Sequence, residues 1–138
     1  MNRNPALSAL SRPQVLLFNF RPDLRTMRIV RYLTESGVAV RQVPPAAFGE
    51  TLEHLLALQD YRQYGEAKLP RFREEMLLMS GFGRDRLDAF LRFFRDEQIL
   101  RVDLKAMLTP TNAGWSAARL HDQLLSERDV MKMRLQGR

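Results

Sequence analysis

Two short runs of apolar residues constrain the fold of this chain more than any other feature. They are Val15-Leu-Leu-Phe18 and Met76-Leu-Leu-Met79, and neither contains a polar residue. Unbroken apolar runs of this length are typical of strands that are covered on both faces of a sheet. Each run is followed by a segment with helical periodicity, so the sequence predicts buried strands that alternate with helices.

The remaining segments extend this alternation to four strands and four helices. We predict strands over residues 14–18, 38–43, 75–80 and 103–109, and helices over 22–36, near 52–56, near 87–94 and from Trp115 or Ser116 onward. The helix near residues 87–94 has the clearest pattern, because four apolar residues recur at i, i+3, i+4 and i+7.

The placement of charge predicts the order of the strands. The segments at 38–43 and 103–109 are interrupted by charged residues, which edge strands tolerate, so the two apolar runs are expected at the centre. We therefore predict an α/β fold, a three-layer α/β/α domain with a four-stranded, mostly parallel sheet in the order 2-1-3-4. Right-handed crossovers would place the first two helices on opposite faces. The alternative is a three-stranded sheet with the fourth segment irregular.

Composition limits the class of protein. The chain has 138 residues and no cysteine, which excludes disulfides, thiolate metal sites and cysteine nucleophiles. No apolar run approaches the ~20 residues of a membrane span, and the first residues lack the apolar run of a secretory signal. We expect a cytoplasmic protein with no membrane partner. Its predicted parts are a flexible arm (1–12), a single α/β domain (13–125) and a basic helical extension (126–138).

The balance of charge favours anionic partners. The net charge is +6 and the isoelectric point is near 10.5, which assists association with anionic ligands, acidic proteins or nucleic acid. Residues 60–74 interleave two Tyr and one Phe with three Arg, a combination that can hold single-stranded nucleic acid. An RNA-associated protein that uses this connection and the basic tail is therefore the alternative function. The connection could instead be a solvated segment or a lid.

Polar loops follow the first, third and fourth predicted strands. In a parallel sheet these loops would meet in a crevice at the carboxyl edge. Its candidate ligand-binding residues are Asn19, Ser80, Gly81, Gly83, Arg84, Thr109, Thr111, Asn112 and Trp115. Glycines between a strand and a helix can turn N–H groups toward an anion, and Arg84 adds positive charge. We predict that the crevice binds a small anionic ligand or a protein partner.

Several of these residues have purely structural alternatives. Gly81 and Gly83 could serve only a tight turn between strand and helix. Thr111, Asn112 or Ser116 could cap the next helix. Trp115 could pack that helix onto the sheet, with its indole N–H bonded to a carbonyl.

Catalytic and metal-binding patterns are missing from the sequence. His54 and His121 are the only histidines, and neither has a ligand-like partner at i+4, so we expect no metal site. The predicted strand ends lack the acidic cluster that a phospho-receiver needs for Mg²⁺. No complete phosphate loop or dinucleotide fingerprint is present, so no cofactor is expected. We predict a non-enzymatic binding or regulatory module. An enzyme of unknown class, built on Ser80, Thr109, Thr111 and Asn112, would lack an obvious general base.

Two stretches carry a family resemblance. They are Glu75-Met-Leu-Leu-Met-Ser-Gly-Phe82 and Lys105-Ala-Met-Leu-Thr-Pro-Thr-Asn112 followed by Trp115. With Val15-Leu-Leu-Phe-Asn19 and Val43-Pro-Pro45, they resemble a small bacterial family of domains of unknown function, numbered three-seven-eight-three. The resemblance covers about residues 14–125, and the stretch from Lys105 to Trp115 is its most specific part. It implies an α/β domain and no particular activity.

Overall fold

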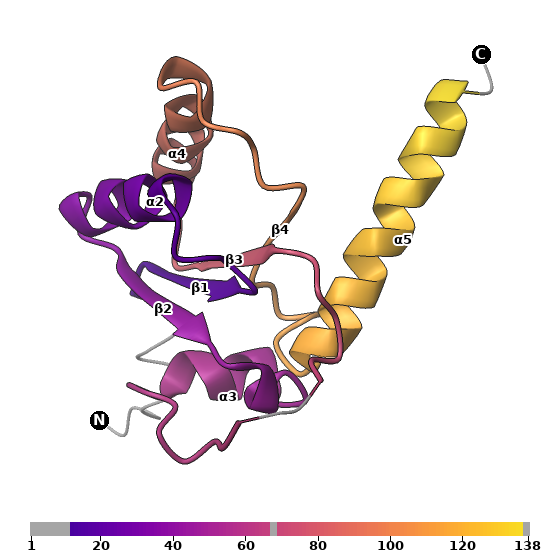
Figure 1. Cartoon of the computed structure of the whole chain (residues 1–138). Coiled ribbons are helices and arrows are strands. Elements are labelled where there is room, and N and C mark those ends of the chain that lie inside the picture. Colours follow the sequence, from indigo (N-terminus) through magenta and orange to yellow (C-terminus); the bar gives the residue numbers. More distant parts are fainter. Residues whose placement is uncertain (1–11, 67–68, 137–138) are drawn as a thin grey trace.

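The fold is a four-stranded sheet between two layers of helices (Figure 1). The computed structural model describes residues 12–66 and 69–136. Its strands are β1 (Gln14–Phe18), β2 (Ala39–Val43), β3 (Met76–Ser80) and β4 (Leu104–Met107). Its helices are α2 (Leu24–Glu35), the 3-10 helix η1 (Pro45–Ala47), α3 (Leu52–Ala57), α4 (Arg84–Asp96) and α5 (Ala117–Gln136). Residues 1–11 of the predicted arm lie outside the described residues.

The strand order is β2-β1-β3-β4, as the distribution of charge predicts. Side chains of β1 alternate between two hydrophobic clusters, because successive residues of a strand point to opposite faces. Leu16 and Phe18 pack with α3 and α5, whereas Val15 and Leu17 pack with α2 and α4. The three layers and the placement of the first two helices on opposite faces are therefore confirmed. The three-stranded alternative is wrong, since β4 pairs with β3.

The direction of β3 differs from that of its central neighbour. β1 pairs in parallel with β2, and β3 pairs in parallel with β4, but β1 and β3 are antiparallel. The register places Gln14 opposite Ser80 and Phe18 opposite Met76. The sheet is mostly parallel, as predicted. However, the carboxyl ends of β3 and β4 lie at the edge where β1 and β2 begin, so the expectation that all the strands end at one edge is wrong.

The connection from Leu58 to Glu75 makes this reversal possible. A parallel crossover needs only one segment to return across the sheet, and a helix usually supplies it. Here α3 crosses the face, and the long connection then leads the chain back to the edge where β1 ends (Figure 1). β3 can therefore start at that edge.

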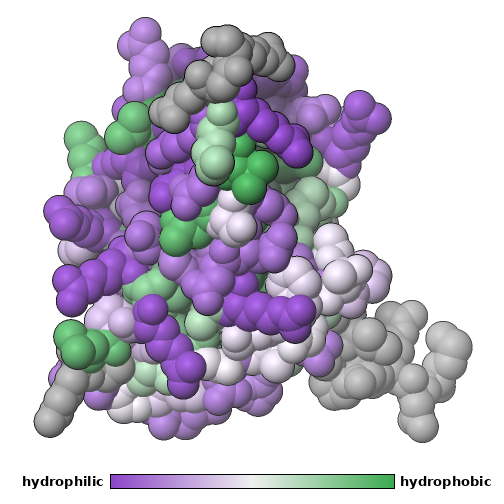
Figure 2. Space-filling view, turned by 90° about the vertical axis from the view of Figure 1, so that its right-hand side faces the viewer, coloured by the Kyte–Doolittle hydropathy of each residue, from purple (hydrophilic) through white to green (hydrophobic). Residues whose placement is uncertain are grey.

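Helix α5 extends well beyond the sheet (Figure 1). Its first turns pack through Ala117 and Leu120, whereas Val130, Met131 and Met133 are exposed. Figure 2 shows apolar residues as separate patches among hydrophilic ones on the face it presents. The helix continues without a break across residues 125 and 126, and the predicted division between domain and extension stays a prediction.

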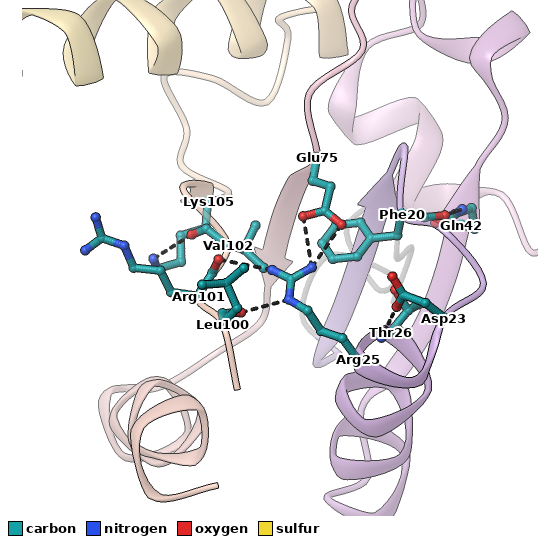
Figure 3. A network of polar contacts seen from close by, with 10 residues as sticks. All are labelled: Phe20, Asp23, Arg25, Thr26, Gln42, Glu75, Leu100, Arg101, Val102 and Lys105. Carbon is teal, nitrogen blue, oxygen red and sulfur yellow. Dashed lines mark hydrogen bonds and ion pairs between the residues drawn. The ribbon is translucent and has the colours of Figure 1, made fainter. Parts of the chain in front are cut away.

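The Arg25 side chain holds the start of β3 against α2 and the segment that precedes β4 (Figure 3). Its Nη1 lies 2.9 Å from both carboxylate oxygens of Glu75. Its Nε donates to the carbonyl of Leu100 at 2.8 Å and its Nη2 to that of Arg101 at 3.0 Å. All three guanidinium nitrogens are therefore used within the fold.

Replacing Arg25 should destabilise the protein substantially. We expect Arg25→Ala to lower the free energy of unfolding by about 2 kcal/mol, because Glu75 and two carbonyls lose a charged partner. Arg25→Lys should recover only part of this, since an ammonium lacks the planar fork. The control is Arg31→Ala, whose exposed pair with Glu35 should contribute less than about 0.5 kcal/mol. Urea unfolding of the three variants tests this, and equal losses for Arg25→Ala and Arg31→Ala would contradict it.

Gly81 lies against the chain that enters β1. It has a φ of +74°, and a Cβ placed on it would lie 2.3 Å from the carbonyl oxygen of Arg12. A side chain here meets both a strained backbone conformation and a backbone atom that cannot move aside. Glycine at this position is therefore explained by packing.

A pair of alanine substitutions tests this role. Gly81→Ala should lower the free energy of unfolding by more than about 1 kcal/mol, because the native conformation is incompatible with a Cβ. The matched control is Gly114→Ala, since a Cβ at Gly114 would have no atom within 4 Å. Thermal denaturation should show a lower midpoint for the first variant only. The same midpoint in both would rule out the steric explanation.

Candidate functional site

Asn19 is separated from the other candidate residues. It follows β1 in a left-handed conformation, with a φ of 64°. Its side-chain amide donates to the carbonyl oxygens of Phe72 at 2.9 Å and Glu74 at 3.1 Å. Asn19 therefore lies where β3 begins, at the sheet edge opposite Ser80. The predicted crevice that would unite Asn19 with the loops after β3 and β4 is wrong, because β1 and β3 are antiparallel.

The loops after β3 and β4 do share one edge. The two strands are parallel, and the N–H of Leu108 donates to the carbonyl of Met79 at 2.8 Å. Asn112 is buried and closes its own loop: its Oδ1 accepts from the Thr109 N–H at 2.9 Å, and its Nδ2 donates to the Met107 carbonyl at 3.0 Å. The Asn112 amide is thus used for loop structure.

The other candidates at this edge differ in accessibility. Ser80 is buried with an exposed fraction of 1%, whereas the side chains of Thr109 and Thr111 are exposed. Gly83 is the N-cap residue of α4, and Arg84 is the exposed first residue of that helix.

Trp115 and Ser116 connect the loop after β4 to α5. Trp115 packs against the hydrophobic cluster on the face of the sheet that α3 and α5 cover. The Arg119 guanidinium lies 4.4 Å from the centroid of the Trp115 ring. The packing role of Trp115 is confirmed, whereas the hydrogen bond of its indole N–H to a carbonyl stays a prediction. The Ser116 hydroxyl oxygen accepts from the Arg119 N–H at 3.1 Å, so Ser116 caps α5 rather than Thr111 or Asn112.

A pocket of about 330 Å³ opens at the edge of the sheet where β1 and β2 begin and β3 ends. The described residues that line it are Arg12, Pro13, Gln14, Gly37, Ala39, Arg41, Leu56, Ala57, Leu58 and Gln59. These residues come from the start of β1 and the chain before it, from β2 and the turn before it, and from the end of α3 and the chain after it. The volume lies within the range of ordinary small-ligand sites.

Arg41 is positioned in this pocket by one of its three nitrogens. Its Nη2 donates to the side-chain oxygen of Gln14 and, at 3.2 Å, to the carbonyl of Leu56. The guanidinium carbon also lies 5.8 Å from the ring centroid of Tyr61. Nε and Nη1 donate to no described residue, so they remain as donors on an oriented guanidinium.

The lining of the pocket carries positive charge without compensation. Arg12 and Arg41 are its charged members, and none of the described lining residues is Asp or Glu. Neither arginine forms an ion pair with a described residue. Sequence reasoning misses this site because an arginine within residues 38–43 fits the pattern of an edge strand equally well. A charged residue in the middle of a short strand was the available signal.

The aromatic residues of the 60–74 connection face the protein interior. Tyr61 and Tyr64 pack against the hydrophobic cluster on the α3 and α5 face of the sheet, and Phe72 is buried between Phe48 and His121. The Tyr61 hydroxyl donates to the Leu55 carbonyl at 2.9 Å, and burial raises the pKa of Tyr61 to about 12. Phe72 is therefore unavailable for base stacking, and Tyr61 and Tyr64 are half-buried, which weakens the RNA hypothesis.

His121 joins α5 to the start of β3. The His121 ring stacks on Phe72 with centroids 4.2 Å apart, and its Nε2 lies 2.8 Å from Glu74 Oε1. Its Nδ1 lies 3.1 Å from Asp122 Oδ1. Within residues 12–66 and 69–136, no group of three or more His, Asp or Glu residues is arranged to hold a metal ion. The role of His121 is to connect two elements.

The contact between Glu74 and His121 should make stability depend on pH. Hydrogen bonds from its own backbone N–H and from His121 hold the pKa of Glu74 below its ordinary value of 4.5. A lowered pKa in the folded state stabilises the protein above pH 4.5, and this contribution is lost as pH falls through the folded value. We expect less than about 1 kcal/mol, because the carboxylate is partly exposed.

Thermal midpoints between pH 7 and pH 3 test this dependence. In Glu74→Gln the thermal midpoint should fall less steeply between pH 5 and pH 3, since glutamine can still accept a hydrogen bond from His121 but does not titrate. Parallel profiles for the two proteins would refute the role of the Glu74 carboxylate.

Comparison with known proteins finds a family model that matches part of the chain. Residues 75–131 match the model of a family described as Domain of unknown function (DUF3783). The predicted resemblance is confirmed over these residues, which include β3, α4, β4 and most of α5. No curated protein and no solved structure matches the chain. Among the helices that the structure describes, none combines the length and apolar character needed to cross a bilayer.

Proposed function

We propose that this chain is a non-catalytic binding module that holds a small anion in the pocket of Arg12 and Arg41. The observation that carries the proposal is the state of Arg41. One of its nitrogens is bound within the fold, and the other two are left as donors in a pocket whose described lining has no carboxylate. A guanidinium oriented in this way is suited to bidentate binding of a carboxylate or phosphate.

The rest of the pocket supports a small ligand with an apolar part. Leu56, Ala57 and Leu58 form one wall, and Pro13 lies directly before β1. Arg12 is exposed and supplies a second cation. A ligand would therefore place its anionic group on Arg41 and its apolar part against the end of α3.

The lining also supports binding rather than catalysis. None of the described lining residues is His, Asp, Glu, Lys, Ser or Tyr, so the pocket offers no group suited to general-base chemistry near neutral pH. We further propose that the exposed candidates at this edge, Arg84, Thr109 and Thr111, assist ligand capture, and that the protein is cytoplasmic.

Ligand-induced stabilisation of the full chain tests the proposal. Inorganic phosphate or phenyl phosphate at millimolar concentration should raise the thermal midpoint, because a ligand that binds only the folded state stabilises it. Arg41→Gln should weaken binding at least tenfold in calorimetric titration, since a charged hydrogen-bond donor is lost. The control is Arg31→Gln, on the opposite face of the sheet, which should bind as the wild type does.

A second variant separates binding from folding. Arg41 also supports Leu56 and Gln14, so its replacement lowers stability as well. Arg12→Gln changes an exposed side chain and should leave the ligand-free midpoint unchanged while it weakens binding. The proposal fails if neither phosphate compound shifts the wild-type midpoint, or if Arg12→Gln and Arg31→Gln respond to them alike.

A further inference from the structure

A second pocket lies on the other face of the sheet, between α4 and the start of β4. It has a volume of about 280 Å³, and its apolar members are Leu91, Phe94, Ile99 and Val102. Its charged members are Arg95, Arg101 and Lys105. All these residues fall within 75–131, the stretch that matches the family model. The pocket is thus separate in both position and residues from the pocket of Arg41.

Lys105 is a half-buried cation of this pocket. It lies in β4 next to residues that pack on the opposite face, and its Nζ donates to the Val102 carbonyl at 2.9 Å (Figure 3). It forms no ion pair with a described residue. Burial, and then the positive charge of Arg101, lower the pKa of Lys105, while Asp103 acts weakly in the opposite sense.

The two arginines of the pocket are only weakly neutralised. Arg95 lies 3.5 Å from Asp96, and Arg101 lies 3.3 Å from Asp103. Both pairs are exposed to solvent and join neighbours along the chain, so their net contribution is small. None of the described lining residues is acidic. The positive charge of Arg101 therefore acts on the half-buried Lys105, and an anion bound between the two side chains would relieve this repulsion.

The apolar side of the pocket is also incompletely covered. Leu91 is 40% exposed, although Phe94 and Ile99 beside it are buried. A ligand with an apolar body could cover Leu91 and gain about 25 cal/mol for each Å² removed from water. The pocket therefore combines apolar side chains with cations at one side.

We propose that the pocket between α4 and β4 is a second ligand site, which binds a carboxylate carried on a small apolar body. The carboxylate would accept from Lys105 Nζ and from the Arg101 guanidinium, and the apolar body would lie on Leu91, Phe94 and Ile99. Benzoate and hexanoate have this chemistry. Acetate lacks the apolar body, and benzyl alcohol lacks the charge.

Binding should be visible at Lys105 itself. The chain has three lysines, Lys68, Lys105 and Lys132, so its NMR spectrum contains few lysine side-chain signals. The signal that disappears in Lys105→Met is that of Lys105. A bound carboxylate favours the ammonium form, so benzoate should raise the pKa of Lys105. Benzyl alcohol should not.

Affinity measurements complete the test. Lys105→Met keeps an unbranched side chain, so the variant should fold, and it should bind benzoate at least tenfold more weakly. The control Lys132→Met, on the exposed part of α5, should bind as the wild type does. Leu91→Asn should weaken benzoate binding more than acetate binding. The proposal is overturned if millimolar benzoate leaves the Lys105 signal unchanged, or if Lys105→Met binds benzoate with wild-type affinity.

Discussion

The antiparallel pairing of β1 with β3 is the constraint on which the rest of the structure depends. Each outer strand runs parallel to its inner neighbour, so this single pairing decides which loops share an edge of the sheet. It brings Glu75 within reach of Arg25, and it brings Gly81 against the entry to β1. It also brings the end of β3 to the edge where the pocket of Arg41 opens.

Arginines account for most of the positive charge of this chain, but the fold uses them in different ways. Arg25 has partners for all three of its guanidinium nitrogens, and Arg119 covers the Trp115 ring. Arg41 is held by one nitrogen only. A fully bonded guanidinium stabilises the fold and has little left to offer a ligand, whereas a partly bonded one is oriented and still able to donate. Net charge alone does not separate these two roles.

The secondary structure and the layers could be predicted from local patterns, whereas the site could not. The apolar run from Met76 to Met79 is buried on both faces, as its composition indicates. The candidate site failed at Asn19, whose amide supports the start of β3 rather than a ligand pocket. The sequence does not single out Arg41 and Lys105, because a cation in a strand can be either a solvated edge residue or a ligand-binding residue. Only its three-dimensional neighbours reveal whether it has a carboxylate partner.

The sequence by itself determined where the strands and helices form and which strands are central. These properties follow from periodicity and charge over a few neighbouring residues. Only the tertiary structure decided the direction of β3, and with it which loops lie at the same edge of the sheet. A strand that is apolar on both faces has the same pattern in either direction, and the long connection before it allows both. The observed direction is held by contacts between distant residues, Asn19 with Phe72 and Arg25 with Glu75, which no local pattern encodes.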